Sequence, residues 1–186
     1  MLIEQIDFYQ NKLFNVETRD HVRNVSEMTV YIAEILGFSD DELYKIREIS
    51  RFHDIGKIRI PLDVLERNGP LTDEEMKLVR KHPEYGRDIL RDFGYSDEEL
   101  TMVLQHHEKP DGSGYPFGLI GQEISIEAKI IGVVDVMDAL LSPRAYKKAW
   151  SEEKVKDFFI KNEENFSEII IKVVLKHFDN LLLLRR

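Results

Sequence analysis

Histidines and acidic residues recur along this chain at positions that only folding can bring together. Five of the six histidines lie in four separate segments, and an aspartate in a fifth segment follows them. Imidazole and carboxylate together suit transition metals such as iron, manganese, zinc or nickel, and the chain has no cysteine. A metal site built from these segments would also hold the fold together. The set is His21, His53, Asp54, His82, His106, His107 and Asp135.

Helical periodicity predicts an all-α fold. Apolar residues recur at helical spacing between Thr18 and Leu36, and Gly37 follows as a stop. The apolar stretch 125–141 is long enough to predict a buried helix, and further helices are expected after Ser151 and Ser167. Three more helix starts have the spacing of a capping box. These are Ser39 with Glu42, Thr72 with Glu75, and Ser96 with Glu99.

One segment departs from this helical pattern. Residues 108–124 contain four glycines and two prolines and predict a long loop, which in a compact domain is usually functional or disordered. No repeat, low-complexity tract or linker divides the chain, so residues 1–186 are expected to form a single domain.

Charge and hydropathy exclude several classes of partner. With 35 acidic and 26 basic residues the formal net charge is -9, which argues against binding to DNA or RNA polymers and to anionic membranes. The longest apolar run is too short to span a bilayer, and the first residues lack a secretory signal. We therefore expect a cytoplasmic protein.

Taken singly, the first metal-binding candidates are weak. Glu17 and His21 are four residues apart and share a helix face, but such pairs are more often surface contacts. His53 and Asp54 follow apolar residues at a helix end, where a capped terminus or a satisfied core histidine is the alternative. His82 precedes a proline and is uninformative alone.

The later candidates are stronger. Neighbouring helical residues diverge by about 100°, so His106 and His107 are expected to serve different metals, although a helix C-terminus also favours histidine. Asp135 lies in the apolar run IIGVVDVMDALL, where a metal would make its burial favourable. Asp138, one turn later, either extends the same polar face or faces solvent.

In this order the motifs resemble the HD-GYP family, a branch of the HD phosphohydrolase superfamily. The resemblance runs from about residue 17 to about residue 147 and includes HDIGK at 53–57, HHEKPDGSGYP at 106–116 and DVMDALLSPRAYK at 135–147. It implies an HD-domain helical bundle of about seven helices with a long GYP loop. It also implies a metal-dependent phosphodiesterase of bacterial second-messenger signalling that hydrolyses cyclic di-GMP to pGpG and, in some members, GMP.

The resemblance also assigns roles by position. His21, His53, Asp54 and Asp135 match the general metal set, and His82, His106 and His107 complete at least a second site. Glu17 resembles the subset of members that hold three metals, so two or three divalent ions are expected, iron or manganese first. Lys57, Asp138, Arg144 and Lys147 match substrate-contacting positions. Asp111, Gly112, Gly114, Tyr115 and Pro116 form the GYP loop. Ala145 departs from the proline that many relatives carry.

The expected chemistry follows from these roles. Asp54 bridges two metals, a hydroxide held between them attacks phosphorus in line, and Lys57 stabilises the developing negative oxygens. Arg144 is expected to grip the second phosphate or to stack on a guanine. The GYP loop is expected to close over the ligand or to dock a diguanylate cyclase (GGDEF) domain.

Other functions stay open. The chain can instead be an HD phosphohydrolase for another cyclic dinucleotide or for a nucleotide monoester. It can also be a catalytically silent module that senses the dinucleotide or binds a cyclase. Degenerate modules usually lose metal ligands, and the retention of all candidates favours the enzyme.

Overall fold

The computed structural model describes residues 18–67, 69–143 and 148–185. These residues form helices and loops, with one isolated β-bridge between Asp111 and Ile120, so the predicted all-α fold is confirmed. No described helix is both long and apolar enough to cross a bilayer. The α-helices are α2 (Arg19–Ile35), α3 (Asp40–Ser50), α4 (Leu62–Leu65), α5 (Asp73–Val79), α6 (His82–Asp92), α7 (Asp97–Gln105), α8 (Ile126–Leu141), α9 (Glu152–Lys161), α10 (Glu168–Lys176) and α11 (Phe178–Leu184). Three short 3-10 helices are η1 (Ile55–Arg59), η2 (Gly121–Glu123) and η3 (Glu163–Asn165).

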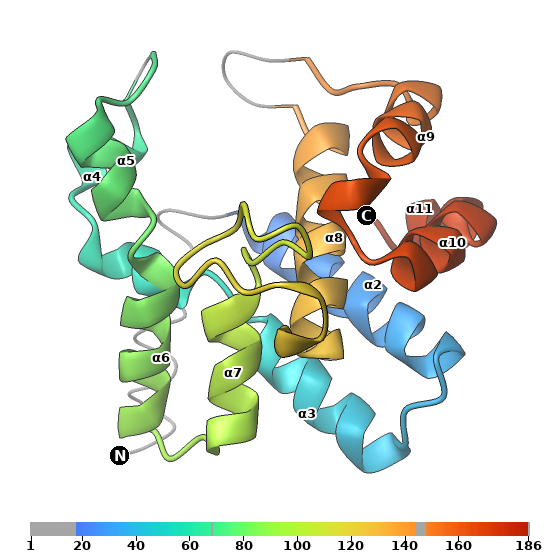
Figure 1. Cartoon of the computed structure of the whole chain (residues 1–186), viewed down its shortest axis with the longest axis horizontal. Helices are drawn as coiled ribbons and strands as arrows, with labels where there is room; N and C mark the ends of the chain where they lie inside the picture. Colours follow the sequence, from blue (N-terminus) through green and yellow to red (C-terminus); the bar gives the residue numbers. More distant parts are fainter. Residues whose placement is uncertain (1–17, 68, 144–147, 186) are drawn as a thin grey trace.

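Helix α8 is the central element of the bundle (Figure 1). It packs against α2 and α7, and α9 and α10 pack against it further along. Its side chains Ile130, Ile131 and Val134 are fully buried, which explains the apolar composition of the segment. Buried apolar residues from α2 to α11 form one contiguous cluster, as a single domain requires. A single domain over all of residues 1–186 stays a prediction.

The predicted helix starts are confirmed. Both hydrogen bonds of the capping box form at Ser39, Thr72 and Ser96. Helices α8, α9 and α10 follow Ser125, Ser151 and Ser167 as expected.

A second helix, which the sequence pattern did not predict, closely follows the helix that begins after Thr72. The helix that begins there ends at Val79, and α6 begins at His82 with Pro83 in its first turn. Proline suits that position because its missing N–H has no helical partner there. This break, together with the short helices α4 and α11, raises the number of described α-helices above the predicted seven. The break also puts His82 at a buried helix start.

We predict that truncating the core in α9 destabilises the chain strongly. Phe159 is 0% exposed and Ile160 is 55% exposed. Phe159→Ala is expected to lower the free energy of unfolding by about 3–5 kcal/mol, because it removes buried apolar surface and leaves a cavity. Ile160→Ala, the neighbouring control, is expected to change it by less than about 1 kcal/mol. Urea denaturation measures both, and equal losses would contradict the packing of α9.

Candidate metal centre

Three histidines at helix ends share one local arrangement. The Nδ1 atom of His53 lies 2.9 Å from the Ser50 carbonyl oxygen, that of His82 lies 2.8 Å from the Val79 oxygen, and that of His106 lies 2.6 Å from the Val103 oxygen. Each carbonyl belongs to the last turn of α3, α5 or α7, where carbonyl groups lack helical partners. A carbonyl only accepts, so each ring donates through Nδ1 and presents its Nε2 atom to the interior.

These Nε2 atoms converge on Asp54. The Oδ1 atom of Asp54 lies 3.0 Å from His82 Nε2 and 3.8 Å from His106 Nε2. Its Oδ2 atom lies 3.3 Å from His53 Nε2 and 2.6 Å from Lys57 Nζ. The two oxygens of one carboxylate therefore face two groups of imidazoles, as a bridging ligand must.

Ligand atoms in the described part of the chain form two groups, each with its members within 4.8 Å of one another. Asp54 belongs to both groups. One group is Asp54, His82, His106 and His107, and the other is His21, His53 and Asp54.

The polar atoms at this centre fit divalent metal ions. His53 Nε2 and Asp54 Oδ1 are buried and form no hydrogen bond within the described residues. His82 Nε2 and His106 Nε2 lie 3.3 Å apart, although Nδ1 of each ring is committed to a carbonyl. Two facing lone pairs repel unless a proton or a cation lies between them. Nitrogen and carboxylate donors of this kind suit divalent transition metals.

Electrostatics keep the acid ionised and two of the imidazoles neutral. Burial would raise the pKa of Asp54, but the charges of Lys57 and His53 outweigh it and hold that pKa well below its usual range. Burial lowers the pKa of His106, and burial with the neighbouring imidazoles holds the pKa of His107 well below its usual range. Metal ions bind the deprotonated forms of these groups.

His53 is the exception. Burial would lower its pKa, but Asp54 and Asp135 outweigh burial and raise that pKa to about 9. The position beside its Nε2 therefore attracts positive charge, which a divalent ion would supply in place of the proton.

Asp135 lies beside the second group, next to His21 and His53. His21 Nε2 lies 3.4 Å from Asp135 Oδ1, and His53 Nε2 lies 3.9 Å from the same oxygen. His21 is positioned by α2, whose N-cap Thr18 accepts a hydrogen bond from the His21 backbone N–H at 3.1 Å. Its Nδ1 donates to Asp138 Oδ2 at 2.9 Å, which directs Nε2 toward Asp135.

Asp138 corrects one expectation drawn from the sequence. The fully buried acid of α8 is Asp138, at 0% exposure, whereas the Asp135 side chain keeps 15% exposure. Asp138 accepts hydrogen bonds from His21, Asn24 and Arg185. Burial would raise its pKa, but the bonds and charges of His21 and Arg185 outweigh burial and lower that pKa to about 2. A buried carboxylate engaged in this way holds His21, and contact between Asp138 and the substrate stays a prediction.

The GYP loop packs onto the metal centre. Glu108, 6% exposed, accepts backbone hydrogen bonds from Phe117 at 2.7 Å and Leu119 at 2.9 Å and so folds the loop over its own start. The ring of Tyr115 stacks on His107 with centroids 4.8 Å apart. The peptide bond between Tyr115 and Pro116 is cis. The loop thus closes one side of the histidine cluster.

Other loop residues face solvent or shape the turn. Asp111 is exposed and accepts a hydrogen bond from the Ser113 backbone at 2.9 Å. Gly112 has φ of 79°. A side chain at Gly114 would meet the Lys109 nitrogen at 2.4 Å, so only glycine allows the loop to approach its start.

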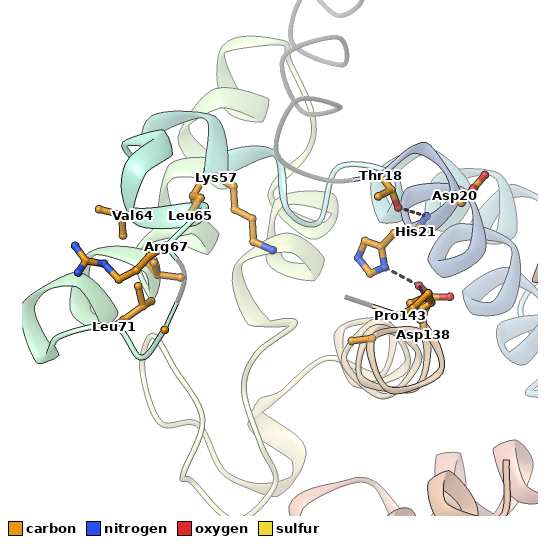
Figure 2. A pocket seen from close by; sticks show the side chains of 14 residues that line it. Thr18, Asp20, His21, Lys57, Val64, Leu65, Arg67, Leu71, Asp138 and Pro143 are labelled. Atoms are coloured by element: carbon orange, nitrogen blue, oxygen red, sulfur yellow. Dashed lines mark hydrogen bonds and ion pairs between the residues drawn. The ribbon is translucent and has the colours of Figure 1, made fainter. Parts of the chain in front are cut away.

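A cleft of about 610 Å³ opens beside the metal centre. Figure 2 shows Lys57 extending toward the cleft from one side and His21 facing it from the other. The wall on the side of α4 contributes Val64, Leu65, Arg67 and Leu71, and the opposite wall contributes Thr18, Asp20, Asp138 and Pro143. The cleft therefore combines apolar surface with the positive charge of Lys57 and the edge of the candidate metal site.

Three predicted residues lie outside the described residues. They are Glu17, Arg144 and Lys147, and Ala145 lies there too. Their sequence neighbours Thr18 and Pro143 both line the cleft.

Sequence analysis missed several supporting residues. Asn24 lies one turn after His21, and this spacing indicates that the two side chains share one face of the helix. Glu108 stands inside the HHEKPDGSGYP string but was given no role. Gly132 lies in α8, where a Cβ would meet the His106 carbonyl oxygen at 2.5 Å. Arg185 had no local signal, because its partner is 47 residues away.

The chain is similar to several known proteins. A family model described as HD domain matches residues 3–164. The chain is 42% identical over 136 residues to the cyclic di-GMP phosphodiesterase response regulator RpfG of Xanthomonas campestris, covering 72% of this chain and 36% of that protein. It is 34% identical over 175 residues to a 3'3'-cGAMP-specific phosphodiesterase of Vibrio cholerae, covering 91% of this chain and 33% of that protein. The chain thus spans about a third of these relatives.

Solved structures share the fold. An HDG"Y"P protein of Bdellovibrio bacteriovorus matches with a TM-score of 0.69 and 21% identity, covering 88% of this chain and 51% of that one. The HD domain of the L. monocytogenes phosphodiesterase PgpH, in complex with cyclic-di-AMP, matches with a TM-score of 0.67 and 19% identity, covering 94% of this chain and 93% of that one.

We predict that Glu108→Gln loosens the GYP loop. An amide accepts through one oxygen and turns its NH2 group toward the second backbone N–H, so one buried hydrogen bond is lost at a cost of about 1–3 kcal/mol. Hydrogen exchange at the Phe117 and Leu119 amides is expected to accelerate by about tenfold or more. Glu123→Gln is the control, because Glu123 accepts a single exposed bond from the Ile120 N–H, which an amide oxygen can keep. Unchanged exchange in Glu108→Gln would contradict this role.

Proposed function

Because this chain belongs to the HD domain family, in its HD-GYP branch, we propose that it is a metal-dependent phosphodiesterase that hydrolyses cyclic di-GMP to pGpG, with GMP as the alternative end product. The observation that carries the proposal is the bridging position of Asp54 between two groups of imidazoles beside an open cleft. A silent sensor has no need to keep both groups, so their assembly favours catalysis.

We propose that two divalent ions bind at this centre, iron or manganese first, and that Glu17 adds a third. His82, His106 and His107 would hold one ion, His21, His53 and Asp135 another, and Asp54 would join them. Such ions supply an activated nucleophile at neutral pH and neutralise charge on the phosphate.

The protein's own groups supply position and charge. Asp54 is ionised and fixed by Lys57, and the Nδ1 bonds hold the imidazoles in one tautomer. Lys57 Nζ, at the edge of the cleft, would stabilise negative charge on the phosphate oxygens. The apolar wall of Val64, Leu65 and Leu71 offers surface on which a purine can lie. Arg144 and Lys147 would bind the remaining phosphate and base.

A second candidate substrate has a specific observation behind it. The relative that covers 91% of this chain is named as specific for 3'3'-cGAMP. Cyclic di-GMP comes first because the relative with 42% identity is named for it. A panel of cyclic di-GMP, 3'3'-cGAMP and cyclic di-AMP separates the candidates.

The GYP loop is also proposed to dock a diguanylate cyclase (GGDEF) domain. Phe117 is 56% exposed and Ile120 is 58% exposed, and both extend from the loop that covers the histidine cluster. A partner bound there would contact the loop whose Tyr115 stacks on His107.

We predict that His53→Ala and Asp54→Ala abolish hydrolysis. Protein loaded anaerobically with iron or manganese is expected to linearise cyclic di-GMP, and each substitution removes a ligand that the other groups cannot replace. Chromatography of the products measures turnover, and circular dichroism checks helical content. His177→Ala is the control, because His177 bonds to Tyr31 away from the cluster. Parental activity in both ligand variants would refute the assignment of the centre.

We predict that Glu17→Ala removes one metal ion per chain. A carboxylate four residues before His21 is expected to hold a third ion, so metal analysis should fall from three equivalents to two. His53 and Asp54 stay intact in this variant, and the two remaining ions are its internal control. A third equivalent that survives the substitution would remove the proposed role of Glu17.

A further inference from the structure

Arg185 connects the C-terminal side of α11 to the metal centre through a buried acid. Its Nε donates to Asp138 Oδ1 at 2.7 Å, and its Nη2 donates to Ser142 Oγ at 2.9 Å. The Arg185 side chain is 18% exposed although it lies just after the last described helix. A guanidinium with two directed bonds and little exposure is fixed in one geometry.

The acid that Arg185 contacts has no acceptor position left. An ionised carboxylate accepts about four hydrogen bonds, and four donors surround Asp138. Oδ1 accepts from Arg185 Nε at 2.7 Å and Asn24 Nδ2 at 3.0 Å, and Oδ2 accepts from His21 Nδ1 at 2.9 Å and Ser142 Oγ at 3.3 Å. The orientation of this carboxylate is therefore fixed from both oxygens.

Arg185 differs from the other donors in its charge. Among the described residues that bond to Asp138, asparagine and serine are neutral, and a histidine that binds metal through Nε2 is neutral as well. Arg185 carries a permanent positive charge, which an ionised carboxylate at 0% exposure requires as a counterion.

We propose that Arg185 is a positioning residue for the metal site that contains His21. Its guanidinium fixes the orientation of the Asp138 carboxylate and balances its charge. Asp138 in turn holds the His21 ring so that Nε2 points at the site shared with His53 and Asp135. This inference rests on the proposed metal set and adds to it a residue distant in sequence.

Residues other than Arg185 anchor α11 in the core. Phe178 at 1% exposure and Leu181 at 0% bury that helix in the core. These contacts stay when Arg185 is replaced, so the variant is expected to fold. Any effect on the metal site is then expected to come from the lost contacts with Asp138.

We predict that Arg185→Met weakens one metal site selectively. Titration of metal-free protein with Mn²⁺ is expected to show roughly 10- to 100-fold weaker binding at the site that contains His21, as for other residues that orient a metal ligand. Binding at the site of His82, His106 and His107 is expected to stay unchanged. Arg185→Lys keeps the charge and should recover part of the affinity.

A double-mutant cycle separates positioning from general loosening. If Arg185 acts through His21, Arg185→Met causes no further loss of Mn²⁺ affinity in a His21→Ala background. Lys156→Met is the matched control, since it removes an exposed ion pair between α9 and Asp179 of α11, at 3.7 Å, without touching Asp138. Equal weakening of both sites, full additivity in the cycle or the same loss in the control would overturn the proposal.

A metal-free measurement keeps this test independent of catalysis. The Nδ1 proton of His21, bonded to a carboxylate, is expected downfield in the proton NMR spectrum and should shift in Arg185→Met. An unmoved signal would count against the proposal. If the parent chain hydrolyses no cyclic dinucleotide while the signal and Mn²⁺ affinity change as expected, the proposed function fails and the role of Arg185 stands.

Discussion

The ionised carboxylate of Asp54 is the group that the rest of the structure has to accommodate. A buried charge costs several kcal/mol unless it is paired. The chain pairs it with Lys57 on one oxygen and surrounds both oxygens with imidazole nitrogens. Burial alone would raise the pKa of the acid, and the charges of Lys57 and His53 hold that pKa well below its usual range. Because Asp54 is kept ionised between the imidazoles, the centre is suited to binding cations.

The hydrogen bond that satisfies a carbonyl group at a helix end also orients a candidate metal ligand. His53, His82 and His106 each donate through Nδ1 to a carbonyl in the last turn of a helix, where such groups need a donor. The bond caps the helix and leaves Nε2 directed inward. Close approach of backbones makes this convergence possible: a Cβ at Gly56 would lie 1.9 Å from the His82 carbonyl oxygen. Helix ends, rather than helix faces, thus build most of the site.

Residues far away in the sequence hold the side chains of this centre in position. Asp138 from α8 holds His21 of α2, and Arg185 beyond α11 holds Asp138. Glu108 folds the GYP loop so that Tyr115 stacks on His107. The cleft is lined by residues of α2, α4 and α8, with Lys57 on one side and His21 on the other (Figure 2). Positioning of the ligands is therefore distributed over helices from α2 to α11.

The sequence alone determined the helical fold, the capping boxes and the residue types of the metal set, because these depend on local periodicity and on the chemistry of histidine and aspartate. Only the tertiary structure decided which acid of α8 is buried. Asp135 and Asp138 lie one turn apart in the same apolar run, and their exposure depends on what α2 and Arg185 present to them. It also decided that α5 ends before His82 and that Arg185 reaches Asp138. Contacts between residues far apart in sequence leave no local pattern, since each is set by how whole helices pack.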